Sequence, residues 1–550
     1  MNLMNSATAV WKRMWVLHHE AKNLMKFSVS GNNSQWDTES AESTRHKQEG
    51  DEPPSGFDTR QKIGLWLGPL LFLLTLLFVK PESLSAEGVA ILASTLWIAT
   101  WWITEAIPIP ATSLLPIVLF PLTGGLDMDA TASSYGSDTI FLFMGGFIIA
   151  LAMQRWNLHK RIALWIISLI GTNTEKIILG FMVATGGLSM WISNTATAMM
   201  MVPIGLAIIY QVSDLLKDDD SIDTSPENFN FGKALMLGIA YSASIGGLGT
   251  LIGTPPNTIF AGVVSELYGV EISFARWMLF GVPISAVFLI IAWIYLVKVA
   301  YKMKFDQLPG GQKVIRDEQS ALGKMVPEEK AVMTVFTFAA LAWITRSFLL
   351  AEFIPGIDDA IIAISASLIL FVIPSKRYRG EALIDWDTAK QLPWGILLLF
   401  GGGLAIAAGF SQSGLAEWFG EQLTVLANVN FFIILIAVIG LVIFLTEITS
   451  NTATGTMMFP IMASLAAAIN VHPYSLMIGA GLAASCAFML PVATPPNAVV
   501  FGSGYLRIPD MAKAGFFLNI LAIFIIAIFI YLLMPLVWGI DITSFPEQYR

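Results

Sequence analysis

The chain alternates between long apolar segments and short polar ones over most of its length. Runs such as 65–79 and 515–538 contain no charged side chain, and about 20 apolar residues suffice to cross the hydrocarbon core of a bilayer. Because backbone amides in hydrocarbon need partners within their own segment, each run is predicted to be helical. The pattern predicts about eleven spans, at 62–80, 86–103, 106–123, 138–155, 232–270, 277–299, 331–350, 358–374, 392–410, 474–504 and 513–537.

Composition agrees with this pattern and narrows the class of protein. Hydrophobic residues make up 55% of the 550 positions and charged residues 13%, too few charges to cover a water-soluble surface. The net charge of −9 resides largely in loops such as 218–220, and no basic patch with interleaved aromatics indicates nucleic-acid binding. The single cysteine, Cys486, excludes an internal disulfide. The five histidines show no metal-ligand spacing, so we do not expect an enzyme.

The distribution of Lys and Arg between the spans predicts the orientation in the cell membrane. Loops after 277–299 and 358–374 are rich in both residues and are assigned to the cytoplasm, whereas the loop 124–137 carries only acidic charges and is assigned to the outside. This assignment holds only if the segments 176–211 and 430–468 are re-entrant hairpins, the first entering from inside and the second from outside. The N-terminus is then cytoplasmic and the C-terminus external.

Two motifs occur twice, in the same order, in the two halves of the chain. Ser-Asn-Thr-Ala-Thr at 193–197 recurs at 450–454, and Thr-Pro-Pro-Asn at 254–257 recurs at 494–497. The two copies of the first motif lie 257 residues apart and those of the second 240 residues apart. Phe143 and Phe400 are also separated by 257 residues. Shared landmarks in one order indicate an internal repeat.

Because the two hairpins enter from opposite sides, the repeats are predicted to be inverted in the membrane. Inverted repeats are common in secondary transporters, which bind substrate near the bilayer midplane on broken helices. The chain then divides into a polar cytoplasmic tail at 1–60, expected to be disordered, a first transmembrane half at 61–325 and a second at 326–550. We therefore predict an all-α polytopic membrane protein with an inverted-repeat transporter fold.

The repeated motifs have a chemistry suited to ions. Ser-Asn-Thr is a poor helix interior but a good capping sequence, and the helix N-terminus that it begins carries about half a positive charge, which suits a carboxylate. Thr-Pro-Pro interrupts a helix because proline lacks the N–H group. The carbonyl groups freed there, at Gly253 and Ala493, are hard ligands suited to Na⁺. Neither motif contains Lys or Arg, so an anion at the tips needs co-bound cations.

At these motifs the chain resembles the divalent anion–sodium symporter family, in particular its bacterial sodium/dicarboxylate symporters, over about residues 60–540. The resemblance implies a homodimer in which a transport domain moves against a scaffold domain, an elevator motion that imports dicarboxylates with Na⁺. The sodium ligands implied are Ser189, Ser193, Asn194 and Gly253 at one site and Thr446, Thr449, Asn451 and Ala493 at the other. The substrate contacts implied are Ser193, Asn194, Thr195, Thr254, Pro255, Ser450, Asn451, Thr452, Thr494 and Pro495.

Some alternatives stay open at this stage. The second motif is preceded by Glu447 where the first has Met190, and this ionisable residue either tunes sodium binding or serves as a structural cap. Succinate, malate and fumarate are the substrates that the resemblance implies. A related carrier for sulfate, phosphate or citrate, a dicarboxylate exchanger without sodium coupling, and an ion channel fit the same motifs.

Overall fold

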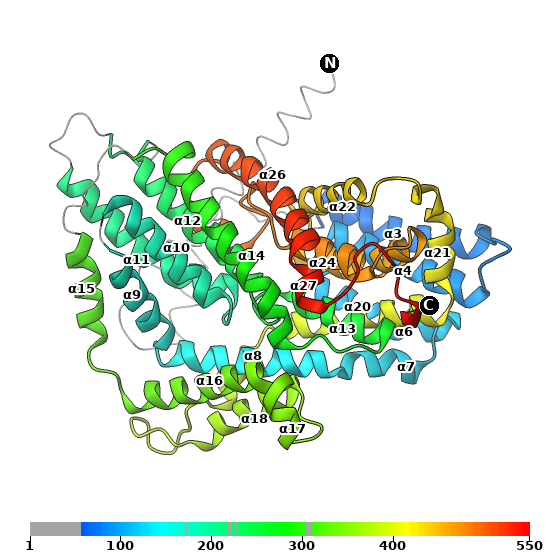
Figure 1. Cartoon of the computed structure of the whole chain (residues 1–550), viewed down its shortest axis with the longest axis horizontal. Helices are drawn as coiled ribbons and strands as arrows, with labels where there is room; N and C mark the ends of the chain where they lie inside the picture. Colours follow the sequence, from blue (N-terminus) through cyan, green and yellow to red (C-terminus); the bar gives the residue numbers. More distant parts are fainter. Residues whose placement is uncertain (1–56, 172, 217–222, 227, 304–310, 550) are drawn as a thin grey trace, which may run out of the picture.

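The computed structural model describes residues 57–549 except for 172, 217–222, 227 and 304–310 (Figure 1). Helices form most of this part of the chain, and an isolated β-bridge joins Pro374 and Ala382. The all-α prediction is confirmed for these residues. Most of the predicted tail, residues 1–56, lies outside the described residues, and the first described helix, α3 (Thr59–Phe78), begins at Thr59.

Short polar side chains set the ends of the first helices. Asp58 caps α3 by accepting a hydrogen bond from Thr59 N, and Ser85 caps α4 (Ala86–Thr104) by accepting one from Gly88 N. The other helices of the first half are α5 (Ile109–Thr112), α6 (Leu115–Thr123), α7 (Met128–Ser133), α8 (Asp138–Arg155), α9 (Leu158–Ile170), α10 (Thr174–Ser189), α11 (Asn194–Leu215), α12 (Asn230–Gly247), α13 (Pro255–Tyr268), α14 (Phe274–Ile294) and α15 (Gly311–Leu322).

The second half begins with α16 (Pro327–Thr345) and follows a similar order. Wider π-helical turns extend α14 through Tyr295–Ala300 and α16 through Arg346–Leu350. The remaining helices are α17 (Ala351–Phe353), α18 (Asp359–Val372), α19 (Trp386–Ala389), α20 (Trp394–Gln412), α21 (Leu415–Leu423), α22 (Phe431–Thr446), α23 (Asn451–Ala468), α24 (Pro473–Ala484), α25 (Pro495–Phe501), α26 (Ile508–Leu532) and α27 (Met534–Trp538).

Helices of the two halves match at the spacings found in the sequence. α10 and α22 begin 257 residues apart and end 257 residues apart, and α11 and α23 begin at the same spacing. α13 and α25 begin 240 residues apart, each at the first proline of its motif. The short helices α9 and α21 also correspond. The sequence pattern missed both because they carry polar residues on one side.

Eight helices in the described part of the chain are long and apolar enough to cross a membrane, or nine if the bent pair formed by α21 and α22 counts as one span. About eleven spans were predicted. The predicted spans 232–270 and 474–504 are each interrupted, the first between α12 and α13 and the second between α24 and α25. The predicted span 106–123 consists of α5 and α6, because Pro110 and Pro116 lie in the first turns of separate helices.

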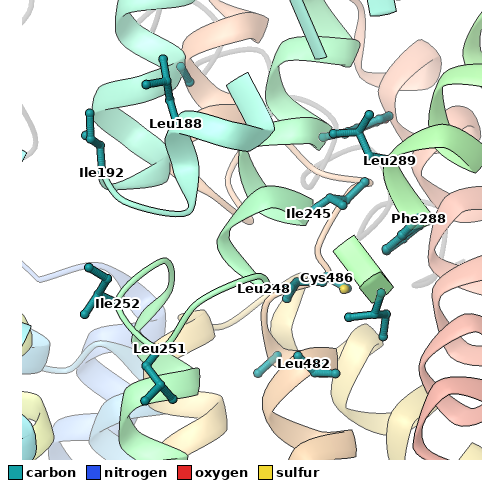
Figure 2. Close-up of a cluster of buried hydrophobic side chains, with 14 of the residues drawn as sticks. Leu188, Ile192, Ile245, Leu248, Leu251, Ile252, Phe288, Leu289, Leu482 and Cys486 are labelled. Carbon is teal, nitrogen blue, oxygen red and sulfur yellow. The ribbon is translucent and has the colours of Figure 1, made fainter. Parts of the chain in front are cut away.

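Each pair of helices that carries a Ser-Asn-Thr motif contacts both halves of the molecule. α11 packs against α12 of its own half and against α25 of the other, and α23 packs against α24 and α13. Figure 2 shows apolar side chains around the first interruption, including Ile245 before it and Leu248, Leu251 and Ile252 within it. This exchange of contacts brings the four motifs to the centre of the molecule.

The crossing of α10 and α12 depends on glycine. A Cβ atom on Gly246 would lie 2.2 Å from the Gly186 carbonyl oxygen, so only glycine lets these backbones meet. We expect Gly246→Ala to separate the helices and to reduce the free energy of unfolding by about 1–3 kcal/mol. The measurement is the thermal unfolding midpoint of the purified protein in detergent. Gly187→Ala is the control, because nothing lies within 4 Å of a Cβ atom there. Equal midpoints for the two variants would contradict this packing.

Candidate functional site

The two Ser-Asn-Thr motifs begin helices at the ends of tight turns. We call residues 190–193, between α10 and α11, the first tip, and residues 447–450, between α22 and α23, the second tip. Ser193 accepts a hydrogen bond from Ala196 N at 3.3 Å, and Ser450 accepts one from Ala453 N at 3.5 Å. The serines are therefore N-caps, as predicted, and each tip presents the positive end of a helix dipole.

The two Thr-Pro-Pro-Asn motifs end the interruptions of the broken helices. We call residues 248–254 the first break and residues 485–494 the second. The Asn257 side chain donates to the carbonyl groups of Gly247, at 3.0 Å, and Thr250, at 2.8 Å. Asn497 donates in the same way to Ala487 and Leu490, both at 3.1 Å. Each asparagine thus fixes the shape of its own break, and the repeat extends to individual hydrogen bonds.

Both tips and both breaks line one cavity with a volume of about 800 Å³. Every residue predicted to contact the substrate lies on its wall: Ser193, Asn194, Thr195, Thr254, Pro255, Ser450, Asn451, Thr452, Thr494 and Pro495. The predicted sodium ligands Gly253, Thr449 and Ala493 line it as well. Ser189 and Thr446 are fully buried behind the tips. The structure therefore brings together residues as far apart in the sequence as Ser189 and Pro495.

Oxygen atoms converge behind the first tip. The Ser189 hydroxyl donates to Ala243 O at 2.7 Å and lies 2.5 Å from Asn194 Oδ1. With the Asn194 amide turned over, its nitrogen faces three oxygen atoms: Ser189 Oγ at 2.5 Å, Ala243 O at 3.1 Å and Gly253 O at 3.3 Å. The end of α10, α12 and the first break thus each contribute an oxygen atom. Such neutral, hard oxygens suit a small cation.

The second tip repeats part of this arrangement. The Thr446 hydroxyl lies 2.7 Å from Asn451 Oδ1 and donates to Ala484 O at 2.9 Å. Thr449 does not join this pair, because its hydroxyl donates to Leu445 O at 2.8 Å and lies 2.6 Å from Thr454 Oγ1. Among the described residues no group of three or more His, Cys, Asp or Glu side chains could hold a metal ion. The cation ligands that the two tips and breaks offer are neutral hydroxyl, amide and carbonyl oxygens.

Glu447 holds the second break in place. Its carboxylate accepts hydrogen bonds from the backbone N–H groups of Phe488, Met489 and Leu490, at 2.8 to 3.1 Å, and from the Asn519 side chain at 2.8 Å. Of the two roles left open for this residue, the hydrogen bonds fit the structural cap. In the first half Met190 packs against Gly249 of the first break instead.

Sequence reasoning missed several apolar walls of the cavity. Phe143 and Phe147 on α8, Ile252 in the first break and Ile396 on α20 all line it. The Phe143 ring lies 5.0 Å from the ring of Phe400, its partner in the repeat. The repeat of Phe143 at Phe400 could therefore have indicated a residue of the cavity wall. Nothing in the sequence marked Phe147, Ile252 or Ile396.

The mouth of the cavity is charged. Asp58, Arg60 and Glu105 line it, at the start of α3 and just beyond the end of α4. These residues lie outside every motif, and Asp58 and Arg60 fell within the segment predicted to be a tail. No sequence signal connected them with the site.

Whole-sequence comparison agrees with this geometry. A model of the sodium:sulfate symporter transmembrane region matches residues 61–539. The chain belongs to this symporter family. Two similar members are sodium-dependent dicarboxylate transporters named SdcS. The protein from Staphylococcus saprophyticus is 54% identical over 89% of this chain and 94% of its own length. That from Staphylococcus aureus MRSA252 is 56% identical over the same shares of the two chains.

Solved structures of more distant transporters share the fold. The antimetabolite efflux pump MtrF of Neisseria gonorrhoeae superposes with a TM-score of 0.52 at 13% identity, over 87% of this chain and 96% of its own. The YdaH transporter of Alcanivorax borkumensis gives 0.53 at 11% identity, over 88% of this chain and 100% of its own. The chain therefore shares the fold of these two transporters.

The capping role of Glu447 gives a testable result. Glu447→Ala leaves three backbone N–H groups and the Asn519 amide without their acceptor, and each unsatisfied buried group costs about 1–3 kcal/mol. We expect a clearly lower thermal unfolding midpoint for the purified variant. Glu421→Ala, at an exposed acidic position on α21, is the control and should not change the midpoint. A Glu447→Ala variant as stable as the control would rule out the cap.

Proposed function

We propose that this chain is a sodium-coupled symporter that imports C4-dicarboxylates such as succinate, malate and fumarate across the cell membrane. The observation that carries the proposal is the meeting of two helix N-termini and two broken helices in one cavity, with neutral oxygens behind the tips. The dicarboxylate transporters that are 54% and 56% identical support the substrate class.

In this proposal each end of the substrate meets one tip. One carboxylate accepts hydrogen bonds from Ser193, Asn194 and Thr195 at the start of α11. The other accepts them from Ser450, Asn451 and Thr452 at the start of α23. Free N–H groups in the first turn of a helix bind anions, and capping hydroxyls extend that set of donors. Thr254, Pro255, Thr494 and Pro495 then form the walls between the carboxylates.

Sodium binds behind the tips in this proposal. Ser189, Ser193, Asn194 and Gly253 form one site, and Thr446, Thr449, Asn451 and Ala493 form the other. Two helix N-termini supply roughly one positive charge together, which does not neutralise a dianion. Because the tips contain no Lys or Arg, co-bound sodium ions supply the rest, and coupling follows from this charge balance.

We place the opening of the cavity at the start of α3, because the exposed residues Asp58 and Arg60 line it there. If the N-terminus is cytoplasmic, the molecule is open to the inside. The paired helices of the two halves support an inverted repeat, in which an exchange of conformations carries the tips and breaks to the other side by an elevator motion. A homodimer would provide the fixed scaffold for that motion.

Reconstituted transport tests the function directly. Purified protein in proteoliposomes should take up labelled succinate saturably, driven by an inward sodium gradient and without internal dicarboxylate. Equal uptake with choline or potassium in place of sodium would contradict symport, and a need for internal dicarboxylate would establish exchange. A second candidate is a sulfate carrier, because the family model is that of sodium:sulfate symporters. Competition by sulfate but not by malate or fumarate would support it.

The hydroxyls behind the tips test the sodium sites. Ser189→Ala and Thr446→Ala each remove one oxygen ligand, and we expect sodium affinity to fall about 5- to 150-fold, the equivalent of roughly 1–3 kcal/mol. Succinate affinity should fall at low sodium and recover at high sodium, because the two ligands are linked. The readout is the sodium activation curve of uptake.

Thr185→Ala is the matched control for Ser189→Ala. Thr185 lies one turn earlier on α10, is equally buried, and donates only to Phe181 O of its own helix. Its removal should leave sodium activation unchanged. If Ser189→Ala and Thr446→Ala behave like this control, neither hydroxyl binds sodium.

A further inference from the structure

Trp191 in the first tip and Ile448 in the second occupy matching positions, 257 residues apart. Each residue touches the first long helix of the opposite half of the molecule. Trp191 contacts α16, the first helix of the second half, and Ile448 contacts α3, the first described helix of the first half. The two contacts differ in chemistry, although the tips are related by the repeat.

The first tip is held by an apolar stack. The Trp191 ring is stacked on Phe274 at 5.9 Å and meets Phe336 edge-on at 5.1 Å. Trp343 lies parallel to Trp191 at 6.4 Å and is 1% exposed. Aromatic pairs of this kind each contribute roughly 0.5–1.5 kcal/mol beyond the area that they bury. The first tip is therefore held by an apolar, aromatic contact.

Besides the Glu447 hydrogen bonds that join it to the second break, the second tip is contacted by an exposed side chain of α3. The Ile448 side chain is 61% exposed, and its carbonyl oxygen accepts a hydrogen bond at 3.3 Å from Arg60 Nη2. The same nitrogen donates to Ile103 O near the end of α4. Arg60 therefore bridges three elements, because it belongs to α3 and its guanidinium joins the end of α4 to the tip.

The base of this bridge is itself fixed. Trp101 on α4 donates to Gly64 O on α3 at 2.9 Å, and Gln61 on α3 donates to Glu105 O at 3.2 Å. These two hydrogen bonds fix α3 to α4. The start of α3 therefore stays with α4 when the second tip moves. A movement of the tip relative to this pair must break the Arg60–Ile448 hydrogen bond.

We propose that Arg60 is a positioning residue for the second tip: it holds Ser450, Asn451 and Thr452 against the open cavity and releases them when the tip moves away. The functional part of this inference rests on the proposed function, since it takes these residues to bind substrate. A guanidinium suits the task because its several donors can bridge two carbonyl groups at once. At an exposed site water can replace the hydrogen bonds that Arg60 loses. Release of the second tip from Arg60 therefore costs less than release of the first tip from the aromatic contact of Trp191.

Hydrogen exchange of the tips tests the proposal without any transport assay. In Arg60→Gln, reconstituted in nanodiscs, backbone amides of residues 447–452 should exchange about 3- to 10-fold faster than in the wild type. Amides of residues 190–195 should keep their rate. Trp191→Ala should give the opposite result, with faster exchange at the first tip alone. Lys62→Gln is the matched control, because it removes a positive charge from the same exposed turn of α3.

The kinetics of succinate uptake distinguish a loss of positioning by Arg60 from a general loss of protein stability. Arg60→Gln should raise the apparent KM for succinate on the side to which the cavity opens by about 3- to 10-fold, with a smaller change in maximal rate. Arg60→Lys, which keeps the charge but lacks the planar fork, should lie between Arg60→Gln and the wild type. Unchanged exchange at residues 447–452 in Arg60→Gln, or an equal increase in Lys62→Gln, would overturn the proposal. Wild-type protein that does not transport succinate would refute the proposed function instead, and the exchange result would stand.

Discussion

A carboxylate within a membrane needs its charge balanced nearby, because hydrocarbon screens almost nothing and the transfer of a bare ion out of water is prohibitive. In this molecule the residues that line the cavity offer two helix N-termini, several hydroxyls and backbone carbonyls, and at the mouth one arginine, Arg60, beside the carboxylates of Asp58 and Glu105. The helix N-termini favour the anion, while the oxygens behind them favour a cation. In the proposed function neither ligand is well accommodated without the other, and the rest of the structure holds these two sets of groups together.

The breaks expose helix N-termini and carbonyl groups to the cavity, and they lose helical backbone hydrogen bonds in doing so. Side chains nearby replace some of the lost hydrogen bonds. Asn257 and Asn497 bind carbonyls of their own breaks, and Glu447 binds three N–H groups of the second break. Proline at the first position of α13 and α25 removes an N–H group that would have no partner there. Irregular backbone persists in the middle of the molecule because it lines a cavity and several of its polar groups have side-chain partners.

The parts of this arrangement that a sequence reveals are those with a local chemical signature. Ser193 and Ser450 are N-caps, and the prolines at 255 and 495 begin helices, because capping and helix interruption depend on neighbouring residues alone. Convergence of the motifs on one cavity followed from the repeat. Arg60 was missed because its role comes from the distant carbonyls of Ile103 and Ile448, which no local pattern reports. The short helices α9 and α21 were missed because apolar length alone does not mark them.

The most direct measurement of the charge balance is equilibrium binding of succinate to the purified protein as a function of sodium concentration. Isothermal titration at constant ionic strength, with choline replacing sodium, separates the linked effect from screening. If sodium completes the charge compensation, succinate affinity should rise steeply with sodium, and binding should be undetectable in choline alone. Succinate that binds equally tightly in choline would show that the tips hold a dianion without sodium, and would contradict the central claim.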